Sequence, residues 1–600
     1  MKRTCLLAVC ATSALWVNAA PYIGYVYPAG GQQGTSLQLL VGGSGILSKN
    51  DFGHVSGEGV TVRDIIVVPN FPNPSGFQRK WLLNWLENID DGKMTRPPMP
   101  TKQELLDEWR ENPWWETLDK LDDLQRDLVL RDLLARKNSL QSAPSIRQMA
   151  IVKVDIAADA PPGLRELRLW SSVSGVSVPR KFYVSKMPHQ CEPRYISPSR
   201  PQKPLPTIAT VPVAVDGQLM PGEVDVYKFK LERNKSYRFT AQARSLLPFI
   251  GDAVPGHCQL VLRLLNLDNK EVAFVDDVYF NPDPILFYKP AQAGEYTLEV
   301  RDNLYRGRED FVYEVVLDEG QPLPKAYSNP FPDMPEVKYA TLKQKPIDIS
   351  KVQCVTGVLA NKNQQDVISF KGLKGQSLVV EMSARRNGSP LDGLVKLYDD
   401  ANVKLAEADD HKETINIGEY IQHVDPYLCL TLPKDGEYRL VLGDRTQGRG
   451  EDYRYWLRLG PPRPDFEVYS TVSFVNIPVG SFSRVKLMVD RKDGFTNEVK
   501  IVCDDLVLSE NVVGSTNIEK SVAFKAKDER TTKPTPIQLY AEAMINGQQV
   551  RKPVTPADQM MQAFAYNHLL PANTFYALQF RFSSRKSDSG KKKSKKKIEK

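Results

Sequence analysis

Cysteine and histidine are both scarce in this sequence. The 600 residues include seven Cys and six His, and no two Cys have the Cys-x-x-Cys spacing. No two His lie at metal-ligand spacing from each other. Because local zinc sites and small disulfide frameworks depend on such spacings, we expect neither in this chain. A single bridge between two modules is left open.

Local catalytic motifs are absent as well. The sequence has no Gly-x-Ser-x-Gly elbow, no His-Glu-x-x-His, no phosphate-binding loop and no Gly-x-Gly-x-x-Gly after a strand. Chemistry would then need a site assembled from residues that lie far apart in the chain. We therefore expect a protein that is not an enzyme and that needs no cofactor, with calcium as the one ion to consider.

Apolar runs are short throughout the chain. Residues 1–19 begin with two basic residues, continue with an apolar run from Leu6 to Val17 and end in small residues. This pattern is typical of a secretory signal peptide that is cleaved after Ala19. The run is shorter than the roughly 20 apolar residues that span a membrane. We predict a secreted protein, periplasmic, at the cell surface or extracellular, with no transmembrane segment after cleavage.

Positive charge is confined to one end of the chain. The formal net charge is +7, but Arg581 to Lys600 hold ten basic and two acidic residues, so the mature body carries about −3. We predict that residues 571–600 form a basic disordered tail that contacts anionic envelope polymers. Nucleic-acid binding would need basic residues with interleaved aromatics on a folded face, so no nucleic acid is expected as a partner.

An internal repeat dominates the middle of the chain. Asp283 to Tyr313 repeats as Asp425 to Tyr455 at a constant offset of 142 residues without a gap. Self-similarity of this length indicates a duplicated domain. The positions that keep the register in the first copy are Asp283-Pro284, Leu286, Gly294-Glu295-Tyr296, Leu298, Asp302, Glu309-Asp310 and Tyr313.

Each copy shows the alternation of strands. Gly294 to Val300 and Gly436 to Leu442 alternate apolar and polar residues, as expected for a strand with one buried face. Asp225 to Phe229 and Asp366 to Phe370 form a second matched pair, and we interpret Asp225 and Asp366, like Asp310 and Asp452, as structural. The predicted fold class is mainly β, with tandem antiparallel β-sandwich or jelly-roll domains and a helical insertion in the first domain.

These residues carry a resemblance to a known family. The order Asp-x-[Tyr/Ile]-x-Phe, an acidic pair, Asp-Pro, Gly-Glu-Tyr-x-Leu and Glu-Asp-x-x-Tyr resembles the bacterial pre-peptidase C-terminal (PPC) domain, over residues 207–318 and 340–460. The resemblance implies jelly-roll modules that accompany secreted peptidases and other secreted proteins, with no catalytic residues of their own. Arg449 stands where the first copy has Gly307, so that turn departs from the pattern.

The first module, residues 21–187, has strands and Gly-rich turns at both ends that resemble an immunoglobulin-like IPT/TIG domain. An insertion of about residues 75–145 separates those ends, and its Leu residues recur mostly at spacings of three and four, which predicts helices. Trp114 and Trp115 lie in this insertion. They are candidate ligand-binding aromatics, although packing of the insertion onto the sandwich is the interpretation that we favour.

Proline-rich segments separate the modules. Residues 188–206 and 319–339 are predicted to be stiff, extended linkers, with a shorter one at 461–464. Residues 465–570 are predicted to form an immunoglobulin-like β-sandwich. Within it, Asp493-Gly494 separates two alternating runs, which predicts a hairpin.

Acidic residues cluster in loops of both copies. Oxygen ligands gathered beside strands could bind calcium, although Asp in tight turns usually bonds to the backbone and no EF-hand loop is present. The candidate calcium ligands are Asp268, Asp276, Asp277, Asp399, Asp400, Asp409 and Asp410.

Three functions fit these features. The first is a secreted, non-catalytic scaffold that binds a partner or spaces domains, with an envelope or extracellular protein or polysaccharide as the unidentified partner. The second is an accessory component of a secreted peptidase system. The third is a carbohydrate-binding protein that uses exposed aromatic side chains.

Overall fold

The computed structural model describes most of residues 20–580. Gaps lie at residues 47–50, 70–75, 77, 81, 83, 85–101, 104–119, 138–143, 172–174, 194–204, 209, 250–255, 279–280, 321–326, 343–345, 412–414, 419–424, 527–530, 532 and 563–565. The predictions for the signal peptide, for the basic tail beyond residue 580, and for Trp114 and Trp115 lie outside the described residues.

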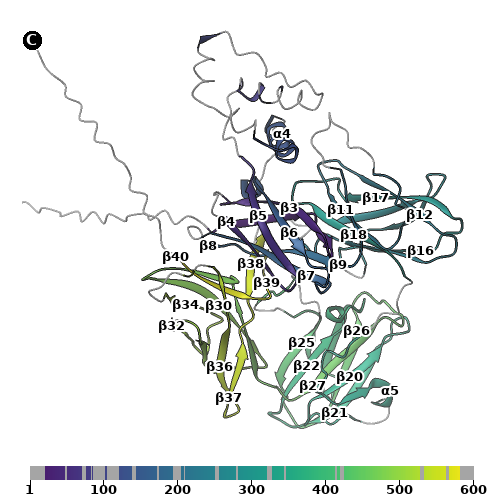
Figure 1. The fold of residues 1–600 in the computed structure, drawn as a ribbon. Helices are drawn as coiled ribbons and strands as arrows, with labels where there is room; N and C mark the ends of the chain where they lie inside the picture. Colours follow the sequence, from purple (N-terminus) through teal and green to yellow (C-terminus); the bar gives the residue numbers. More distant parts are fainter. Residues whose placement is uncertain are drawn as a thin grey trace, which may run out of the picture.

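The chain is mainly β, as predicted, and its first module is a sandwich of two sheets (Figure 1). Apolar side chains from both sheets, such as Leu39, Val152, Leu167 and Phe182, are buried between them. One sheet has the order β1 (Tyr22–Tyr27), β3 (Ser36–Ser44), β6 (Gln148–Ile156) and β5 (Val60–Val67). The other has β2 (Gly30–Gln32), β9 (Arg180–Ser185), β7 (Gly163–Ser171) and β4 (Asp51–Ser56), with β8 (Gly175–Val176) beside β7.

Helix α4 (Asp123–Lys137) is the longest described part of the insertion. Asp122 and Gln125 form a reciprocal cap at its start, because each side chain accepts the backbone N–H of the other, at 2.8 and 3.1 Å. Buried Leu128 and Val129 pack in the same cluster as Val312 of the second module. The insertion therefore helps to join two modules.

The second and third modules have the same topology, which confirms the internal repeat. The second pairs β10 (His189–Cys191), β11 (Val213–Gln218), β18 (Val312–Glu319), β13 (Tyr237–Gln242) and β16 (Ile285–Tyr288) in one sheet, and β12 (Asp225–Leu231), β17 (Gly294–Asp302), β14 (Leu260–Leu265) and β15 (Glu271–Val275) in the other. The third repeats this order with β19 (Glu336–Lys338), β20 (Gln353–Val358), β27 (Arg454–Gly460), β22 (Ser377–Ser383) and β25 (Tyr427–Thr431), and with β21 (Asp366–Gly372), β26 (Gly436–Asp444), β23 (Gly393–Tyr398) and β24 (Lys404–Ala408).

The repeated polar residues stabilise the same positions in both copies. The buried Tyr313 hydroxyl donates to Asp225 at 2.5 Å, and the Tyr455 hydroxyl donates to Asp366 at 2.7 Å. A phenol that donates to a buried carboxylate offsets part of the cost of burying both groups. Asp225 and Asp366 are structural, as predicted.

The Asp of each repeated Asp-Pro pair organises a loop. Asp283 accepts backbone N–H groups from Ala243 and Arg244, and Asp425 accepts that of Arg385 at 2.8 Å. Both carboxylates are buried. Because a buried carboxylate requires several donors, the Asp-Pro position is a loop anchor in both copies.

The fourth module extends further than predicted, because β40 (Phe575–Phe580) lies in its sheets and not in a disordered tail. Its sheets are β28 (Asp465–Ser470), β30 (Phe482–Lys492), β34 (Glu519–Lys525) and β32 (Val507–Ser509); β33 (Val512–Val513), β31 (Val499–Cys503), β36 (Leu539–Ile545) and β37 (Gln548–Pro553); β29 (Phe474–Pro478), β40 and β35 (Thr535–Ile537); and the hairpin β38 (Ala557–Gln562) with β39 (Tyr566–Pro571).

The predicted hairpin at Asp493-Gly494 is wrong. Both residues have positive φ angles, 50° and 78°, as such a turn requires. However, β30 pairs with β28 and β34, whereas β31 pairs with β33 and β36. The turn therefore carries the chain from one sheet to the other. A residue of the third module, Arg458, holds the Asp493 side chain.

The proline-rich segments are not simply extended spacers. β10 pairs in parallel with β11, and β19 (in the second linker) pairs in parallel with β20. Each linker thus adds an edge strand to the sheet that follows it. A strand bonded to a sheet cannot swing freely, so the linkers hold their modules close to their neighbours.

The four modules pack on one another instead of forming an open string (Figure 1). Tyr25 and Val312 share a buried cluster between the first and second modules. Trp170 and Leu578 share one between the first and fourth, and Ile415 and Leu569 share one between the third and fourth. The C-terminal module therefore returns to contact the N-terminal one, which the linker composition did not predict.

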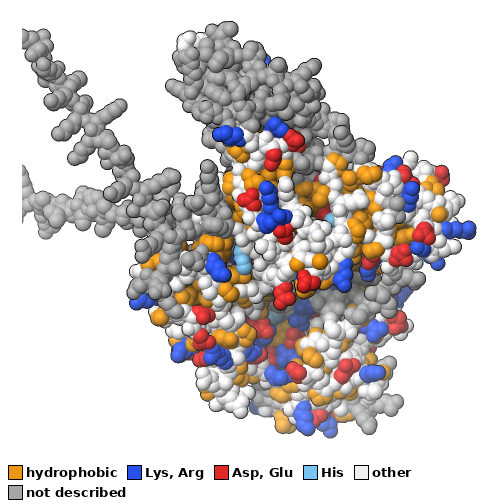
Figure 2. All heavy atoms as spheres, viewed as in Figure 1, with side chains coloured by type: hydrophobic (Ala, Val, Ile, Leu, Met, Phe, Trp, Pro, Cys, Tyr) orange, Lys and Arg blue, Asp and Glu red, His pale blue; other side chains and the backbone are white. Residues whose placement is uncertain are grey.

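Two further features bear on function. The five described Cys are all free thiols, and within the described ranges no helix is long and apolar enough to cross a membrane. Figure 2 shows basic and acidic side chains interspersed on the face in view, without a large patch of one sign.

Candidate functional site

The predicted calcium ligands of the first copy lie in two separate turns. Asp276 accepts the backbone N–H of Asp277 at 2.9 Å, and the Asp268 N–H donates to Asn266 at 3.0 Å. Asp268 lies in the turn between β14 and β15, away from the acidic pair that follows β15. These three carboxylates do not form a group of the kind that holds a metal ion among the described residues.

The predicted ligands of the second copy are paired with basic residues. Lys434 contacts Asp399 at 3.0 Å and Asp400 at 2.5 Å. Arg445 forms an ion pair with Asp409, whose side chain also accepts the backbone N–H of Asp410. The structure therefore brings together the pairs Asp399-Asp400 and Asp409-Asp410, and the seven Asp form no common site in the part of the chain that is described.

A different cluster is brought together where the first two modules meet. His189, Asp216 and Glu314 come from β10, β11 and β18, which are neighbours in one sheet. Asp216 and Glu314 are directly paired residues of β11 and β18. Val213, Val215 and the paired strand residues Val315 and Leu317 face the module core, so the alternate positions that include Asp216 and Glu314 face the first module.

The three side chains are almost fully buried, with exposed fractions of 8%, 0% and 3% for His189, Asp216 and Glu314. His189 Nδ1 lies 2.8 Å from Asp216 Oδ2 and 3.6 Å from Glu314 Oε2. A Cβ atom on Gly30 of β2 would lie 2.5 Å from Glu314 Oε2, so the first module's backbone closes over the cluster at a glycine. Burial of this kind makes each charge costly.

The electrostatics of this cluster follow from burial. Burial and the nearby Asp216 raise the pKa of Glu314 to about 8, although His189 opposes the shift. Burial also raises the pKa of Asp216. Burial acts to lower the pKa of His189, but the hydrogen bond and charge of Asp216 outweigh it and leave that pKa raised. Glu314 therefore keeps its proton at neutral pH when nothing else neutralises it.

Ser185 completes a chain of contacts, because its Oγ lies 2.8 Å from His189 Nε2. The order Ser185, His189, Asp216 is that of a nucleophile, base and acid. Ser185 Oγ, however, already accepts the backbone N–H of Met187 and faces the Met187 carbonyl, each at 3.2 Å. These contacts fit a turn residue that orients the imidazole better than a free nucleophile.

The second copy lacks this cluster at the equivalent positions. Register in the sheets places Glu336, Thr356 and Trp456 where the first copy has His189, Asp216 and Glu314. Thr356 donates to Glu336 at 3.2 Å, and Tyr327 packs against Trp456. The shared fold therefore does not require the His, Asp and Glu residues, which points to a role specific to the first copy.

A groove of about 470 Å³ crosses the other sheet of the second module. Its lining residues come from β12 and the residue before it, from β14, β15 and β17, and from the loop after β17. The exposed fractions of Val226, Phe274 and Tyr305 are 49%, 49% and 51%. The remaining lining residues are Val224, Arg263, Glu271, Glu299 and Arg301.

Charged residues in the groove are held in balanced pairs. Arg263 bonds to Glu271 at 2.9 Å and to Glu299 at 3.0 Å. The Arg301 guanidinium lies 4.7 Å from the centre of the Tyr305 ring, which holds the ring against the sheet. The groove thus combines apolar rings and hydrogen-bonding groups with little net charge.

The third module has no aromatic side chains at the equivalent positions. Gln447 occupies the position of Tyr305, with a φ of 59° against 55°, and Glu407 occupies that of Phe274. A positive φ is unfavourable for Tyr, and the third module forms the same turn without a Tyr. The ring at position 305 is therefore not needed for the turn.

Comparisons with known proteins give no family for this chain. No family model matches it, and no curated protein matches it. Solved structures with partial similarity include a DUF4785-family protein from Legionella pneumophila, at 12% identity over 40% of this chain and 72% of that one, with a TM-score of 0.12. The fibronectin(III)-like modules of CbhA from Clostridium thermocellum show 13% identity over 34% and 95%, with a TM-score of 0.10. A glucan-utilisation protein, SGBP-B, from Bacteroides ovatus shows 11% over 56% and 69%, with a TM-score of 0.14.

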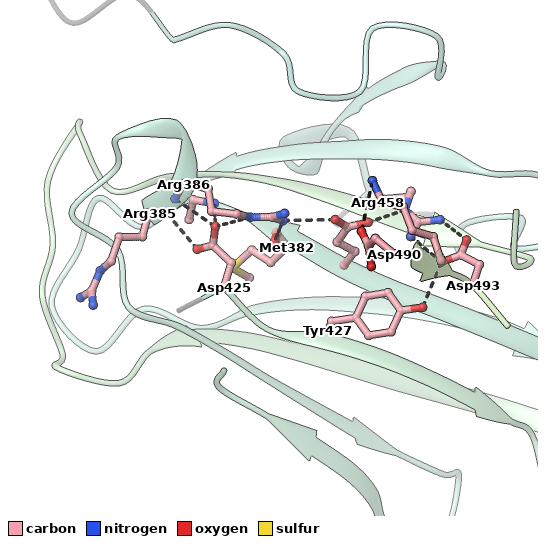
Figure 3. Close-up of polar contacts among 11 residues, drawn as sticks. Met382, Arg385, Arg386, Asp425, Tyr427, Arg458, Asp490 and Asp493 are labelled. Carbon is pink, nitrogen blue, oxygen red and sulfur yellow. Dashed lines mark hydrogen bonds and ion pairs between the residues drawn. The ribbon is translucent and has the colours of Figure 1, made fainter. Parts of the chain in front are cut away.

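A third polar site joins the third and fourth modules (Figure 3). Asp493 accepts two hydrogen bonds from Arg458, at 2.6 and 2.9 Å, one from Tyr427 at 2.9 Å and one from the Arg463 backbone at 2.7 Å. Arg458 also bonds to Glu381 at 2.7 Å. Every acceptor direction of Asp493 is used within the protein, so this site holds modules together and has no free ligand position.

Sequence reasoning missed the His189 cluster because its members are up to 125 residues apart and match no local motif. One signal was present. Asp216 and Glu314 are charged residues next to apolar runs in two strands, at positions where the second copy has Thr356 and Trp456. A departure between two copies of one fold, at a buried position, marks a residue that the fold alone does not need.

Proposed function

We propose that this protein is a secreted, non-catalytic binding scaffold, and that its ligand is a neutral polysaccharide held in the groove of the second module. The observation that carries the proposal is the pairing of two half-exposed rings, Phe274 and Tyr305, with a fixed and charge-balanced Arg263–Glu271–Glu299 group. Sugar rings present apolar faces that pack on aromatic side chains and hydroxyls that bond to planar Arg and carboxylate groups.

Charge balance separates this ligand class from others. A polyanion would favour a site with excess Arg or Lys, and a polycation would favour excess carboxylate. The groove has two Arg and two Glu among its lining residues. A site with balanced charge has no electrostatic preference for a charged polymer, so a neutral polymer suits it best. A polysaccharide ligand also fits the predicted signal peptide of residues 1–19, which would send the protein outside the cytoplasm.

The architecture also supports a scaffold. Three buried junctions hold the four modules together, so the groove is presented on a fixed body. In sequence, the two matched sandwiches resemble PPC modules, which accompany catalytic domains without performing catalysis. In this proposal the second module, the first copy of the repeat, binds the polysaccharide. The third module, the second copy, positions the fourth module.

Affinity electrophoresis in gels that contain soluble neutral polysaccharides tests the proposal. We expect a soluble β-glucan, xylan or galactomannan to retard the mature protein, and Phe274→Ala and Tyr305→Ala each to weaken binding about threefold to tenfold, because one aromatic contact contributes roughly 0.5–1.5 kcal/mol. The matched controls are Glu407→Ala and Gln447→Ala in the third module, which should bind like the wild type.

Two results would count against the proposed ligand. One is retardation by a polyanion such as alginate and by none of the neutral polymers. The other is unchanged binding in the double variant Phe274→Ala, Tyr305→Ala with a loss in the third-module controls.

A further inference from the structure

We propose that His189, Asp216 and Glu314 form a binding site for a divalent transition-metal ion such as Zn²⁺, placed where the first module meets the second. The three ligand atoms lie within 4.8 Å of one another, and among the described residues this is the one group with such geometry. This site is separate from the groove, and its test does not depend on the polysaccharide.

The spacing of the ligand atoms suits a small ion. Zn²⁺ bonds to imidazole nitrogen and carboxylate oxygen at about 2.0–2.2 Å, so tetrahedral ligand atoms lie about 3.3–3.5 Å apart. His189 Nδ1 lies 2.8 Å from Asp216 Oδ2 and 3.6 Å from Glu314 Oε2. These values bracket the required separation, so small rotations of the carboxylates are enough to admit the ion.

One buried oxygen atom in this cluster, Glu314 Oε2, has no hydrogen-bond partner among the described protein groups, on a side chain that is 3% exposed. The fully buried Asp216 carboxylate has His189 as a partner, and the backbone N–H groups of Ala29 and Gly30 also act on it. A buried carboxylate oxygen without a donor is costly, and a cation is the partner that satisfies it. Glu314 Oε2 already points toward His189 Nδ1, as a shared ion would require.

Charge balance favours an ion of charge two. Two carboxylates and a neutral imidazole bring a charge of −2, which a divalent cation cancels completely. The cation would therefore be the group that lets both carboxylates stay ionised in this closed position.

Ser185 provides the support that a metal-bound imidazole needs. When His189 Nε2–H donates to Ser185 Oγ at 2.8 Å, the ring has its Nδ1 lone pair free for an ion. Ligand His residues usually donate their second N–H in this way, which sets both the tautomer and the ring orientation. The Ser185 hydroxyl in turn faces the Met187 carbonyl at 3.2 Å.

The ligand set selects the class of ion. Imidazole with carboxylates suits Zn²⁺ and its first-row neighbours, whereas Ca²⁺ takes six to eight oxygen ligands. β10 comes from the linker, and β2 of the first module lies over the cluster at Gly30. An ion here would therefore strengthen the junction between the first and second modules.

Metal content after equilibrium dialysis of the full mature chain against Zn²⁺ tests the site. We expect about one tightly held Zn²⁺ per chain in the wild type, lost in Glu314→Gln and in His189→Gln, because each change removes a ligand. Glu314→Gln preserves shape and mimics the protonated acid, so the variant should fold, which circular dichroism and thermal unfolding check.

Two variants control for other ligands. Cys191→Ser tests the neighbouring thiol in β10, and Glu336→Gln changes the position that matches His189 in the third module; both should keep the ion. Co²⁺ added to the wild type should give the visible absorption of nitrogen and oxygen ligands without a thiolate charge-transfer band. Equal Zn²⁺ content in the wild type and in folded Glu314→Gln, or a loss confined to Cys191→Ser, would overturn the proposal.

Discussion

Replacement of Arg168 by Met is expected to lower the free energy of unfolding by about 3–5 kcal/mol, since removal of one partner leaves other buried charges uncompensated. Arg168 is 1% exposed and joins the first module to the fourth. It donates to Ser473 Oγ at 2.8 Å and to the Ser177 carbonyl at 3.1 Å, and it lies 3.7 Å from Glu166.

The carboxylates near Arg168 explain the size of this effect. Burial raises the pKa of Glu166 and of Asp558, and in both cases Arg168 opposes the shift. Without the cation, both acids would have to take up protons or remain as unpaired buried charges. Met fills much of the space that the Arg168 side chain occupies. The loss of stability would therefore reflect the missing positive charge more than an empty cavity.

Calorimetry and urea unfolding of the full chain would measure this loss. Arg484→Met is a matched control, because Arg484 forms an exposed pair with Glu510 in the fourth module. An exposed pair contributes about 0–1 kcal/mol. If the Arg168 and Arg484 variants were equally stable, the buried junction would not have the importance that we assign to it.

Asp493→Asn is expected to separate the third and fourth modules at neutral pH, also at a cost of about 3–5 kcal/mol. Arg458 would lose its bidentate partner while it stays 9% exposed. Burial acts to raise the pKa of Asp493, but hydrogen bonds from Arg458 and the Arg463 backbone outweigh it and leave that pKa lowered.

The pH dependence of this effect has a definite sign. A carboxyl group whose pKa is lower in the folded state stabilises the fold at pH values above its unfolded pKa, which is about 3.9. This contribution is lost as the pH falls through the lower folded value. The stability difference between wild type and Asp493→Asn should therefore be full at pH 6–7 and should shrink below about pH 4.

Unfolding midpoints at several pH values would measure the stability difference, and limited proteolysis of the 461–464 linker would measure the separation of the third and fourth modules. Asp504→Asn serves as the control, because Asp504 forms an exposed pair with Arg551. A stability difference that stayed constant from pH 7 to pH 3 would show that ionised Asp493 does not support the junction.

Together these junctions change what the proposed scaffold function requires. Modules on extended spacers would each sample many orientations, whereas modules joined by Arg168 and Arg458 present their surfaces at fixed angles. The groove of the second module and the His189 cluster then lie on one body. A ligand that binds to such a body does not incur the entropy cost of ordering separate domains.

Most of the local structure could be predicted from the sequence. Alternation in Gly294–Val300 and Gly436–Leu442 predicted β17 and β26, and the repeat predicted two sandwiches of the same topology. Tyr313 with Asp225, and Tyr455 with Asp366, hold those sandwiches in the same way. Period-two patterns are local, and each copy buries its apolar face on itself, so neighbouring residues contain the needed information.

The sites could not be predicted in the same way. The candidate Asp residues looked like ligands because they are close in sequence. Asp276, however, accepts a neighbouring backbone N–H, Asp399 and Asp400 contact Lys434, and Asp409 contacts Arg445. Asp493-Gly494 had the sequence of a hairpin turn, but Arg458 of another module holds its carboxylate. In both cases a partner far along the chain, or a local backbone donor, decided what the side chain does.

By itself, the sequence determined the β class and the duplication, because these follow from the alternation of apolar side chains and from repeated residues. Only the tertiary structure decided that the modules pack together, that β10 and β19 join sheets, and that His189, Asp216 and Glu314 meet. The physical reason is that contacts between modules depend on the faces that each sandwich leaves outward, and no local periodicity specifies which outward face meets which.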